Sequence, residues 1–567
     1  PSGRRVGGGP AAAGRTRERR GDRKMSGATE TGRGAGAGAD SGTPARRSTD
    51  SGTRTGTGGP GTAGSGRWRA RAERHSEGLE RFLDIYLDER LLPYSRPDSE
   101  LMRALEGCLN CGTCLSVCPV VGAGAGHPYP GPRTVGTSLS RSLPEFWAAA
   151  DLAGFCTTCM ACEEACPGDV PVYRAVLMMR AKNFERSARE GREPLSRTKL
   201  FLVDFFAGGR LSAAARWGAV FQGLAFRRTE SGEMKARVPL PVGRLAGRVV
   251  PPLARRSLTG EFPDLIPGED PRGPRVAVFA GCLMNHAYTE TGRALVSVLR
   301  RHCREVVVPA DQVCCGAPAL YSGDLPTSRR LAAENARVFE AAGADFIVTG
   351  CATCGDVLGR EYPALFAAPR GVAEPEEAGL VRSFSARVRD VHAFLLREVE
   401  FRRPGADGAV TDGTVGGAAG GARGDMGGDR GDGAGRGAGD AEVLVTIHDP
   451  CHLARGQGVR DEVRELVGAL PGVVLREMQE PAVCCGGAGS FSLDHYELAS
   501  AIRDRKVADI DRTGADVVLT GCPSCRMHIA DGLERAGRAR PVRHPVELLA
   551  EAYERDAAGS HGRGRTG

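Results

Sequence analysis

Short apolar runs alternate with longer amphipathic segments from about residue 275 onward. The runs RVAVFAGC and ADFIVTGCATC are rich in β-branched residues, so we predict two buried strands that end at Cys282 and Cys351. Segments 287–302 and 327–342 repeat their apolar positions with helical spacing. Strands that alternate with helices predict a parallel α/β sheet, and sites form at the carboxyl ends of such strands.

The later part of this pattern repeats the earlier part. GADFIVTGCATC at residues 343–354 returns as GADVVLTGCPSC at residues 514–525, and VCCG also occurs twice. This repeat predicts a duplicated α/β domain, at residues 273–403 and 441–555. Between the copies, residues 404–440 contain fifteen glycines among 37 residues, which predicts a disordered linker.

Residues 76–185 have helical spacing instead, and we predict an α-helical domain there. Its first helix follows five apolar positions: Leu79, Phe82, Leu83, Tyr86 and Leu87. A second short helix at residues 99–106 leads into the first cysteine cluster. The next segment, 186–272, is predicted to be a connector, and its residues 200–256 are apolar with several arginines. Docking to a partner or to a membrane surface is one interpretation of it; we expect the simpler one, packing of these side chains against their own neighbours.

The net charge of +7 comes from one end of the chain. Residues 1–75 carry sixteen Arg and Lys against six Asp and Glu, and removing this +10 leaves −3 for the rest. A basic, Gly/Arg-rich tail could contact RNA or acidic lipid, but its low complexity predicts disorder, so we expect no nucleic-acid partner. Residues 556–567 are predicted to be a second disordered tail. No run of about 18 apolar residues occurs, so we predict no transmembrane segment.

The nineteen cysteines are grouped at short spacings inside a large chain. This grouping favours metal binding in a reducing compartment over disulfide bonds. We therefore predict a cytoplasmic protein, with peripheral attachment to the inner face of the cell membrane as an alternative. A structural zinc or interaction protein is the alternative if these cysteines bind no iron.

Two runs have the pattern C-x2-C-x2-C-x3-C-P, and they end in Pro119 and Pro167. In two-cluster ferredoxins, three ligands of each 4Fe-4S cluster come from one run and the fourth cysteine comes from the other run. We predict two cubane 4Fe-4S clusters on this basis. The first is assigned to Cys108, Cys111, Cys114 and Cys166, and the second to Cys156, Cys159, Cys162 and Cys118.

Two further sets each contain five cysteines, two of them adjacent. The first set is Cys282, Cys314, Cys315, Cys351 and Cys354, and the second is Cys451, Cys484, Cys485, Cys522 and Cys525. Adjacent cysteines rarely suit one tetrahedral zinc ion, and a disulfide between them would strain the peptide. Five thiolates exceed the need of one ion or of an ordinary cubane, so we predict one or two larger clusters. We expect the glycine after each pair to let the backbone approach the metal.

The five-cysteine arrangement resembles the CCG, or cysteine-rich, domain of heterodisulfide reductases, where it holds a noncubane 4Fe-4S assembly. A dicluster ferredoxin module followed by two CCG domains is similar to the iron-sulfur subunits of glycolate oxidase, of bacterial lactate dehydrogenases and of anaerobic glycerol-3-phosphate dehydrogenase. The segments HDPCHLARGQ, CCGGAGSF, TGCPSC and HPVELL look closest to the glycolate oxidase group. Both five-cysteine sets are complete here, whereas electron-transfer members of the group often lack some of these residues.

Other polar residues near the cysteines have more than one interpretation. Cys303 lies outside all motifs, and we predict a buried, idle thiol on a helix. His448, Asp449 and His452 flank Cys451 and could donate hydrogen bonds to cluster sulfur, relay a proton or shape the turn. We expect neither His286 nor His495 to be a ligand. No Gly-rich loop follows a strand and opens a helix in the dinucleotide-binding manner, so we predict no flavin or NAD on this chain.

The resemblance implies an oxidoreductase whose organic chemistry takes place on a partner. An FAD-containing dehydrogenase subunit would oxidise a 2-hydroxy acid such as glycolate or lactate. This chain would then pass the electrons toward quinone or toward another acceptor. A quinone-reducing or cytochrome subunit in the membrane could lie between this chain and the quinone. The alternative function is catalytic: a heterodisulfide-reductase-like subunit that cleaves a disulfide at one noncubane centre.

Overall fold

The structure is a computed structural model that describes residues 96–124, 126–138, 143–207, 210–237, 247–367, 375–405 and 442–563. The helix predicted around residues 79–87, the N-terminal tail and nearly all of the predicted linker lie outside these ranges. Within them, none of the helices combines the length and the apolar character needed to cross a membrane.

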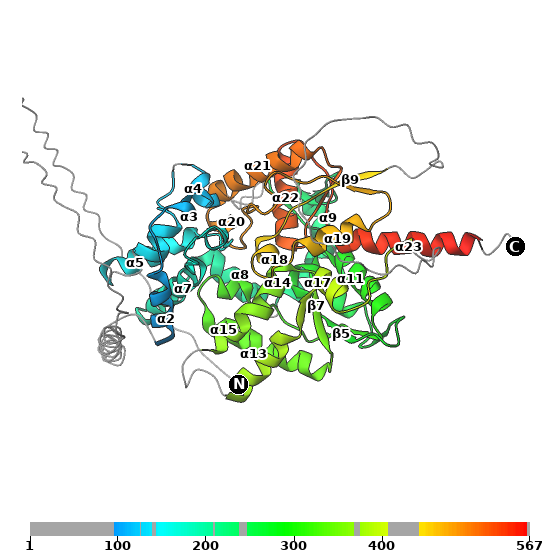
Figure 1. Cartoon of the computed structure of the whole chain (residues 1–567), viewed down its shortest axis with the longest axis horizontal. Coiled ribbons are helices and arrows are strands. Elements are labelled where there is room, and N and C mark those ends of the chain that lie inside the picture. Colours follow the sequence, from blue (N-terminus) through cyan, green and yellow to red (C-terminus); the bar gives the residue numbers. More distant parts are fainter. Residues whose placement is uncertain are drawn as a thin grey trace, which may run out of the picture. The chain divides into compact units, whose positions relative to one another are not determined.

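The cysteine runs of the first half belong to a helical module, blue to cyan in Figure 1. Its elements are α2 (Arg96–Leu105), α3 (Thr113–Ser116), α4 (Pro119–Gly122), η1 (Thr134–Ser138), α5 (Leu143–Leu152), η3 (Ala153–Phe155), α6 (Ala161–Glu164) and α7 (Val172–Arg189). The helix predicted at residues 99–106 corresponds to α2. Helix α7 packs on α2 and α5 and buries Val172, Val176 and Met179, which recur at helical spacing. It forms the base on which the two cysteine loops lie.

Two helices and a small antiparallel sheet form the connector. Helices α8 (Arg197–Ala207) and α9 (Arg210–Ala225) precede β1 (Phe226–Arg228), β2 (Met234–Ala236) and β3 (Val249–Val250), paired in the order β1-β2-β3. The expectation that this region packs its apolar side chains against its neighbours is wrong for part of α9. Trp217, Phe221 and Leu224 each expose more than half of their surface.

The first α/β domain follows. Its elements are η5 (Leu258–Gly260), β4 (Ile266–Pro267), β5 (Arg275–Val278), α10 (Gly281–His286), α11 (Thr289–His302), β6 (Glu305–Val307), α12 (Ala317–Leu320), α13 (Leu325–Ala341), β7 (Phe346–Thr349), α14 (Ala352–Asp356), η6 (Val357–Glu361), α15 (Tyr362–Phe366), α16 (Pro375–Ala386), β8 (Val388–Asp390) and α17 (Val391–Arg397). The sheet order is β4-β6-β5-β7-β8, parallel except for the edge strand β4. Both predicted strands end earlier than expected, because Cys282 already lies in α10 and Cys351 caps α14.

The second α/β domain repeats this arrangement without the antiparallel edge strand. Its elements are β9 (Val443–Ile447), α18 (Cys451–Ala454), α19 (Asp461–Gly468), β10 (Val473–Leu475), α20 (Phe491–Asp494), α21 (Tyr496–Thr513), β11 (Val517–Leu519), α22 (Pro523–Arg535), β12 (Val542–Arg543) and α23 (Pro545–Arg563). The parallel order β10-β9-β11-β12 matches β6-β5-β7-β8. One apolar core contains Val278 of β5 and Ile447 of β9, and α11 packs on α23, so the two domains share an interior.

Candidate metal centres

The first cysteine loop of the helical module surrounds a small cavity. Cys108, Cys111 and Cys114 line it together with Cys166 from the second run. Thr137 Oγ1 donates a hydrogen bond to Cys108 Sγ at 3.6 Å. Cys111 is exposed to solvent, so this group of four lies at the surface.

The second loop brings Cys156, Cys159 and Cys162 together with Cys118 from the first run. The pKa of the Cys118 thiol rises to about 12 because of its burial, and the neighbouring Cys159 and Cys156 add to the effect. The pKa of Cys162 is also raised, by burial and then by Cys156 and Cys159. Each run therefore places its fourth cysteine beside the first three of the other run, and the second of these groups is more buried than the first.

The two loops have the same backbone conformation, although their sequences differ. Positive φ angles occur at Asn110 and Gly112 in the first loop and at the matching Thr158 and Met160 in the second. Left-handed backbone is unfavourable for a β-branched residue such as Thr158, so the fold holds this conformation against a local cost. Such turns direct successive backbone N–H groups inward, which suits an anionic centre.

The five cysteines of the first set converge at the carboxyl ends of β5 and β7. The thiols form a row in the order Cys282, Cys314, Cys315, Cys354 and Cys351, in which each contacts the next. Cys351 caps α14, and its Sγ accepts a hydrogen bond from the Cys354 N–H at 3.4 Å.

The second set repeats this arrangement at the ends of β9 and β11. Its row runs through Cys451, Cys484, Cys485, Cys525 and Cys522, and Cys522 caps α22. The Gly486 N–H donates to Cys484 Sγ at 3.4 Å.

The glycine after each cysteine pair adopts a backbone conformation that other residues avoid. Gly316 and Gly486 both have φ of 81°, a conformation that favours glycine. A Cβ on Gly486 would lie 2.5 Å from the carbonyl oxygen of Ala499 on α21. The turn geometry favours glycine at both positions, and at Gly486 the close approach of α21 also excludes a side chain.

The thiol groups meet one another across module boundaries. Cys351 of the first set contacts Cys522 of the second, and Thr353 Oγ1 lies 3.5 Å from Cys522 Sγ. At the other end of the second set, Cys484 contacts Cys159 of the helical module. Sulfur atoms thus follow one another from the helical module through the second α/β domain into the first.

Different side chains hold the two cysteine-pair loops. In the first domain, Asn335 accepts from the Val313 N–H at 3.0 Å and donates to the Cys314 carbonyl at 3.2 Å. In the second domain, Lys506 donates to the carbonyl oxygens of Glu480 and Pro481. Lys506 is 1% exposed, and burial lowers its pKa. The second loop is therefore held by a buried amine where the first is held by a neutral amide.

His448 faces the second cysteine set from the end of β9. One ring nitrogen lies within 4.8 Å of the sulfurs of Cys485 and Cys525. Nδ1 lies 3.2 Å from the Pro481 carbonyl oxygen, which only accepts, so Nδ1 carries the proton of the neutral ring. Burial lowers the pKa of His448 to about 3, which keeps the ring neutral. Nε2, which has no hydrogen-bond partner among the described residues, then presents a lone pair and cannot donate to sulfur.

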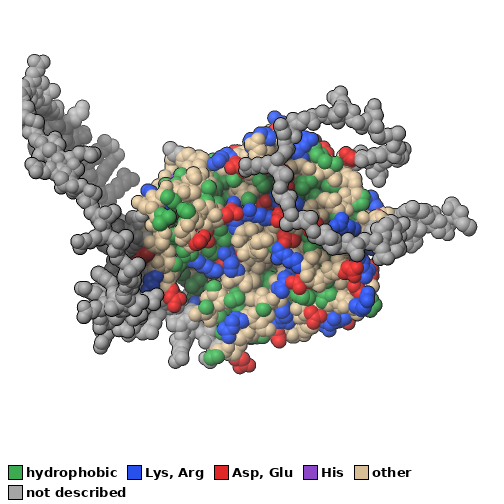
Figure 2. All heavy atoms as spheres, in the orientation of Figure 1, with side chains coloured by type: hydrophobic (Ala, Val, Ile, Leu, Met, Phe, Trp, Pro, Cys, Tyr) green, Lys and Arg blue, Asp and Glu red, His purple; other side chains and the backbone are tan. Residues whose placement is uncertain are grey.

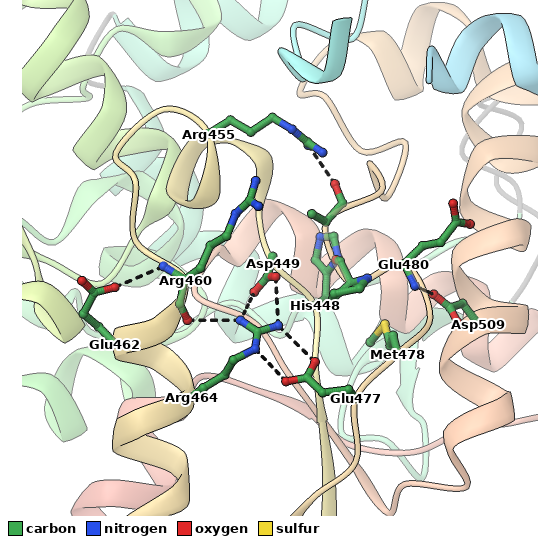
Figure 3. A network of polar contacts seen from close by, with 12 residues as sticks. His448, Asp449, Arg455, Arg460, Glu462, Arg464, Glu477, Met478, Glu480 and Asp509 are labelled. Atoms are coloured by element: carbon green, nitrogen blue, oxygen red, sulfur yellow. Dashed lines mark hydrogen bonds and ion pairs between the residues drawn. The ribbon is translucent and has the colours of Figure 1, made fainter. Parts of the chain in front are cut away.

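Asp449 holds the loop that leads to Cys451. Arg464 binds its two carboxylate oxygens at 3.1 and 3.0 Å and also pairs with Glu477, as Figure 3 shows. Of the roles considered for Asp449, this geometry supports the structural one.

His452 joins the two α/β domains. Its Nδ1 lies 2.6 Å from Asp356 Oδ2, and Arg360 binds the same carboxylate at 2.8 and 2.9 Å. Burial raises the pKa of Asp356, but the hydrogen bond and charge of His452, together with Arg360, outweigh it and leave the pKa below its ordinary value. Tyr321 places its hydroxyl 3.3 Å from the same ring nitrogen.

The remaining candidates are Cys303, His495 and His286. Cys303 is fully buried in the shared core one residue after α11, and burial raises its pKa to about 12. His495 stacks on Phe155 of the helical module at 4.3 Å between ring centroids. His286 is the last residue of α10 and is 6% exposed.

Sequence reasoning missed the residues that hold the loops, above all Lys506 and Asn335. A signal for Lys506 was present, because it occupies the apolar repeat Ile502, Lys506, Ile510 of α21, and Ile502 and Ile510 are buried. A charged residue in such a position indicates a buried polar contact.

The donor set fits iron-sulfur clusters. Buried thiols that converge in fours and fives offer soft ligands, and soft thiolates favour iron-sulfur clusters, zinc or copper(I). Groups of five that contain adjacent cysteines exceed the four positions of a tetrahedral zinc site.

Comparisons with known proteins agree with this geometry. Residues 276–359 and 445–530 match the cysteine-rich (CCG) domain family, and residues 104–170 match the 4Fe-4S dicluster domain family. The chain is 28% identical to one subunit of the fumarate reductase (CoM/CoB) of Methanothermobacter marburgensis, over 82% of this chain and 76% of that protein. It is 27% identical to the probable glycolate oxidase iron-sulfur subunit of Bacillus subtilis, over 79% and 94% of the two chains. Lactate utilization protein A 2 of Bacillus mycoides is 28% identical over 48% of this chain and 98% of its own length.

The chain therefore carries a 4Fe-4S dicluster domain and two CCG cysteine-rich domains. Its relatives include iron-sulfur subunits of the glycolate oxidase and lactate utilization type and a subunit of a fumarate reductase. These matches support an oxidoreductase-type subunit with an electron-transfer role.

Proposed function

We propose that this chain is the iron-sulfur electron-transfer subunit of a flavin-dependent 2-hydroxy-acid dehydrogenase complex. The relatives named for glycolate oxidase and lactate utilization support this substrate class. An FAD-containing subunit would oxidise glycolate or lactate, and this chain would carry the electrons to quinone or another acceptor.

Four groups of cysteines would hold the clusters. Two cubane clusters would bind to the groups completed by Cys166 and by Cys118, and the two five-cysteine sets would each hold a further, noncubane cluster. When bound, such clusters accept and release one electron at a time, which connects two-electron oxidation at a flavin to a chain of single-electron carriers. The protein keeps the inner groups dry and fixes their spacing.

The contact between Cys159 and Cys484 is the observation that carries the proposal, because it leaves no protein layer between the dicluster ligands and the second α/β domain. The difference in solvent exposure between the cysteine groups suggests the direction in which electrons would move. Cys111 is exposed, whereas Cys159 and Cys484 are buried. Electrons would enter at the loop around Cys111 and leave from the set that contains Cys282. We further propose that the protein works at the cytoplasmic face of the membrane.

Anaerobic purification tests the proposal. We expect iron and acid-labile sulfide at about four each per cluster, a copurifying flavoprotein, and dye reduction that depends on glycolate or lactate. A colourless protein with stoichiometric zinc would refute it.

Disulfide reduction is the second candidate, because both five-cysteine sets are complete and meet at Cys351 and Cys522. Two electrons and two protons would convert one disulfide into two thiols. Release of thiols from a heterodisulfide by the reduced chain, without a flavoprotein, would favour this function over the first.

A further inference from the structure

Four large apolar side chains of helix α9 lie on the outside. Trp217, Val220, Phe221 and Leu224 are 67%, 55%, 53% and 78% exposed, and their spacing puts them on one side of the helix. We call these four residues the α9 stripe. A helix that only packed on its own protein would turn such side chains inward.

The side of α9 that faces the rest of the protein carries small residues instead. Ala215 and Ala219 are 2% and 4% exposed, and a Cβ on Gly218 would lie 2.7 Å from the Leu253 side chain. Small residues therefore let α9 pack closely on the rest of the protein, and its large side chains point to solvent. Among the described residues of the chain, none buries the stripe.

The residues that flank the stripe in the sequence are mostly basic, although Glu230 and Glu534 line the same surface hollow as Arg227 and Arg228. Arg216 on α9 and Arg227 and Arg228 on β1 are exposed, and α9 contains no acidic residue. The nearest acidic residues in the sequence are Asp204 before α9 and Glu230 after β1. By contrast, basic and acidic side chains are interspersed over the face drawn in Figure 2. Exposed Trp, Phe and Leu flanked by arginines match the chemistry of an anionic membrane surface, where aromatic rings lie at the headgroup level and arginines reach phosphate.

Hydrogen bonds connect α9 to the last group of cysteines. Gln222 on α9 exchanges two hydrogen bonds with the backbone of Leu253, at 2.9 Å each. The next residue, Ala254, donates to the carbonyl of His286, which ends the helix α10 that contains Cys282. Helix α9 also contacts α10 directly. The stripe thus lies one helix layer from the set where electrons would leave.

We propose that the α9 stripe seats this protein on an anionic lipid bilayer and turns the Cys282 side of the first α/β domain toward the membrane. This orientation would let a membrane-dissolved quinone, or a quinone-reducing subunit, approach that set. The lipid contact stands without the proposed function, and only the choice of acceptor rests on it.

Vesicle flotation of the full-length, anaerobically purified chain tests the inference. The probes are phosphatidylcholine vesicles with and without phosphatidylglycerol. We expect the wild type to float with the anionic vesicles, and the double variant Trp217→Glu/Phe221→Glu to bind about tenfold less, because charged side chains are unfavourable in the interface. Leu265→Glu, at a residue that is 41% exposed elsewhere on the surface, is the matched control and should bind as the wild type does. Replacing Arg216, Arg227 and Arg228 by Gln should reduce the preference for the anionic vesicles.

Two results would overturn the inference. Equal flotation of the wild type and the double variant would assign binding to another part of the chain, such as the basic first 75 residues. Absence of vesicle binding, together with loss of a copurifying protein in the double variant, would make the stripe a protein interface. Iron content and dye reduction with a soluble acceptor, measured on the same samples, report on the proposed function separately.

Discussion

The two α/β domains attach to the helical module in different ways. The first domain does so through buried polar contacts: Glu361 accepts from Tyr173 at 3.1 Å and pairs with Arg174, and Arg180 donates to the carbonyl of Tyr321 at 2.9 Å. The second domain contributes apolar residues of α20 and α21 to the core of the module and brings its sulfur against Cys159. The buried polar contacts and the closeness of the metal ligands are therefore divided between two copies of one fold.

The copies also differ around their cysteines. Phe279 follows β5 at the position where His448 follows β9, and Asn335 holds the first cysteine pair where Lys506 holds the second. The cysteine pattern is the same in both domains, but the charge near it is not. The two centres should therefore differ in reduction potential, because charge and hydrogen bonds near a cluster tune it.

The largest effect is expected from substituting one cysteine in one of the two five-cysteine sets at a time. Cys485→Ser should remove the spectroscopic signal of the second domain's centre and stop reduction of the first domain's centre, while both cubane clusters remain reducible. Cys315→Ser should remove only the first domain's centre, because that set lies at the end of the row. Iron content, acid-labile sulfide and electron paramagnetic resonance of the reduced proteins measure both results. Equal loss of all clusters in either variant would show that the groups do not form independently.

Two glutamates, one at the contact of each α/β domain with the helical module, test how these contacts differ. Glu361 has a 2% exposed side chain, and Glu361→Gln should lower the free energy of unfolding by about 2 kcal/mol, since it neutralises a buried carboxylate that binds the 34% exposed Arg174. Glu164 pairs with Arg455 and Arg460 of the second domain but is 42% exposed, so Glu164→Gln should cost less than about 1 kcal/mol. Denaturant unfolding under anaerobic conditions provides the comparison. Similar losses in both variants would contradict it.

Removing the buried charge of Lys506 should make the reduction potentials of the two centres more alike. Lys506→Met is expected to lower the reduction potential of the second domain's centre by on the order of 50 mV, the size of a weakly screened unit charge. Redox titration followed by electron paramagnetic resonance measures the shift. Lys506→Arg keeps the charge and should retain most of the potential; an equal shift in both variants would indicate a structural effect instead.

The smallest effect concerns acid stability. In the second domain, burial, together with the neighbouring His392, lowers the pKa of His544 to about 4. The unfolded chain binds a proton below about pH 6.5, so this histidine costs stability as the pH falls from 6.5 toward 4, by about 1.4 kcal/mol per pH unit. His544→Asn keeps a side chain able to cap α23, as Asp390 caps α17, and should flatten this slope. Denaturant midpoints between about pH 7 and 5 provide the test; an unchanged slope would mean that other groups dominate.

The cysteine motifs and their recurrence in the sequence were enough to predict the groups of cysteines and the duplicated α/β pattern, because a repeated motif marks a repeated structural unit. The ends of the strands were placed too late, since the segment around Gly281 turns into a helix before Cys282. The contact between Cys159 and Cys484 joins residues 325 positions apart and depends on how whole modules pack, which no local pattern contains. Trp217 was also mispredicted: its apolar character suggested burial, but small residues occupy the inward side of α9 and Trp217 lies on the outer side.

The meeting of Cys351 and Cys522 has a consequence for handling the protein in air. These sulfurs belong to different domains yet touch, so iron-free protein exposed to oxygen could lose two electrons and two protons from them and form a bond across the domain boundary. This disulfide bond would link the two α/β domains covalently and would also prevent iron from binding to the two sulfurs. Reconstitution after aerobic isolation should then require a reductant before the metal is added.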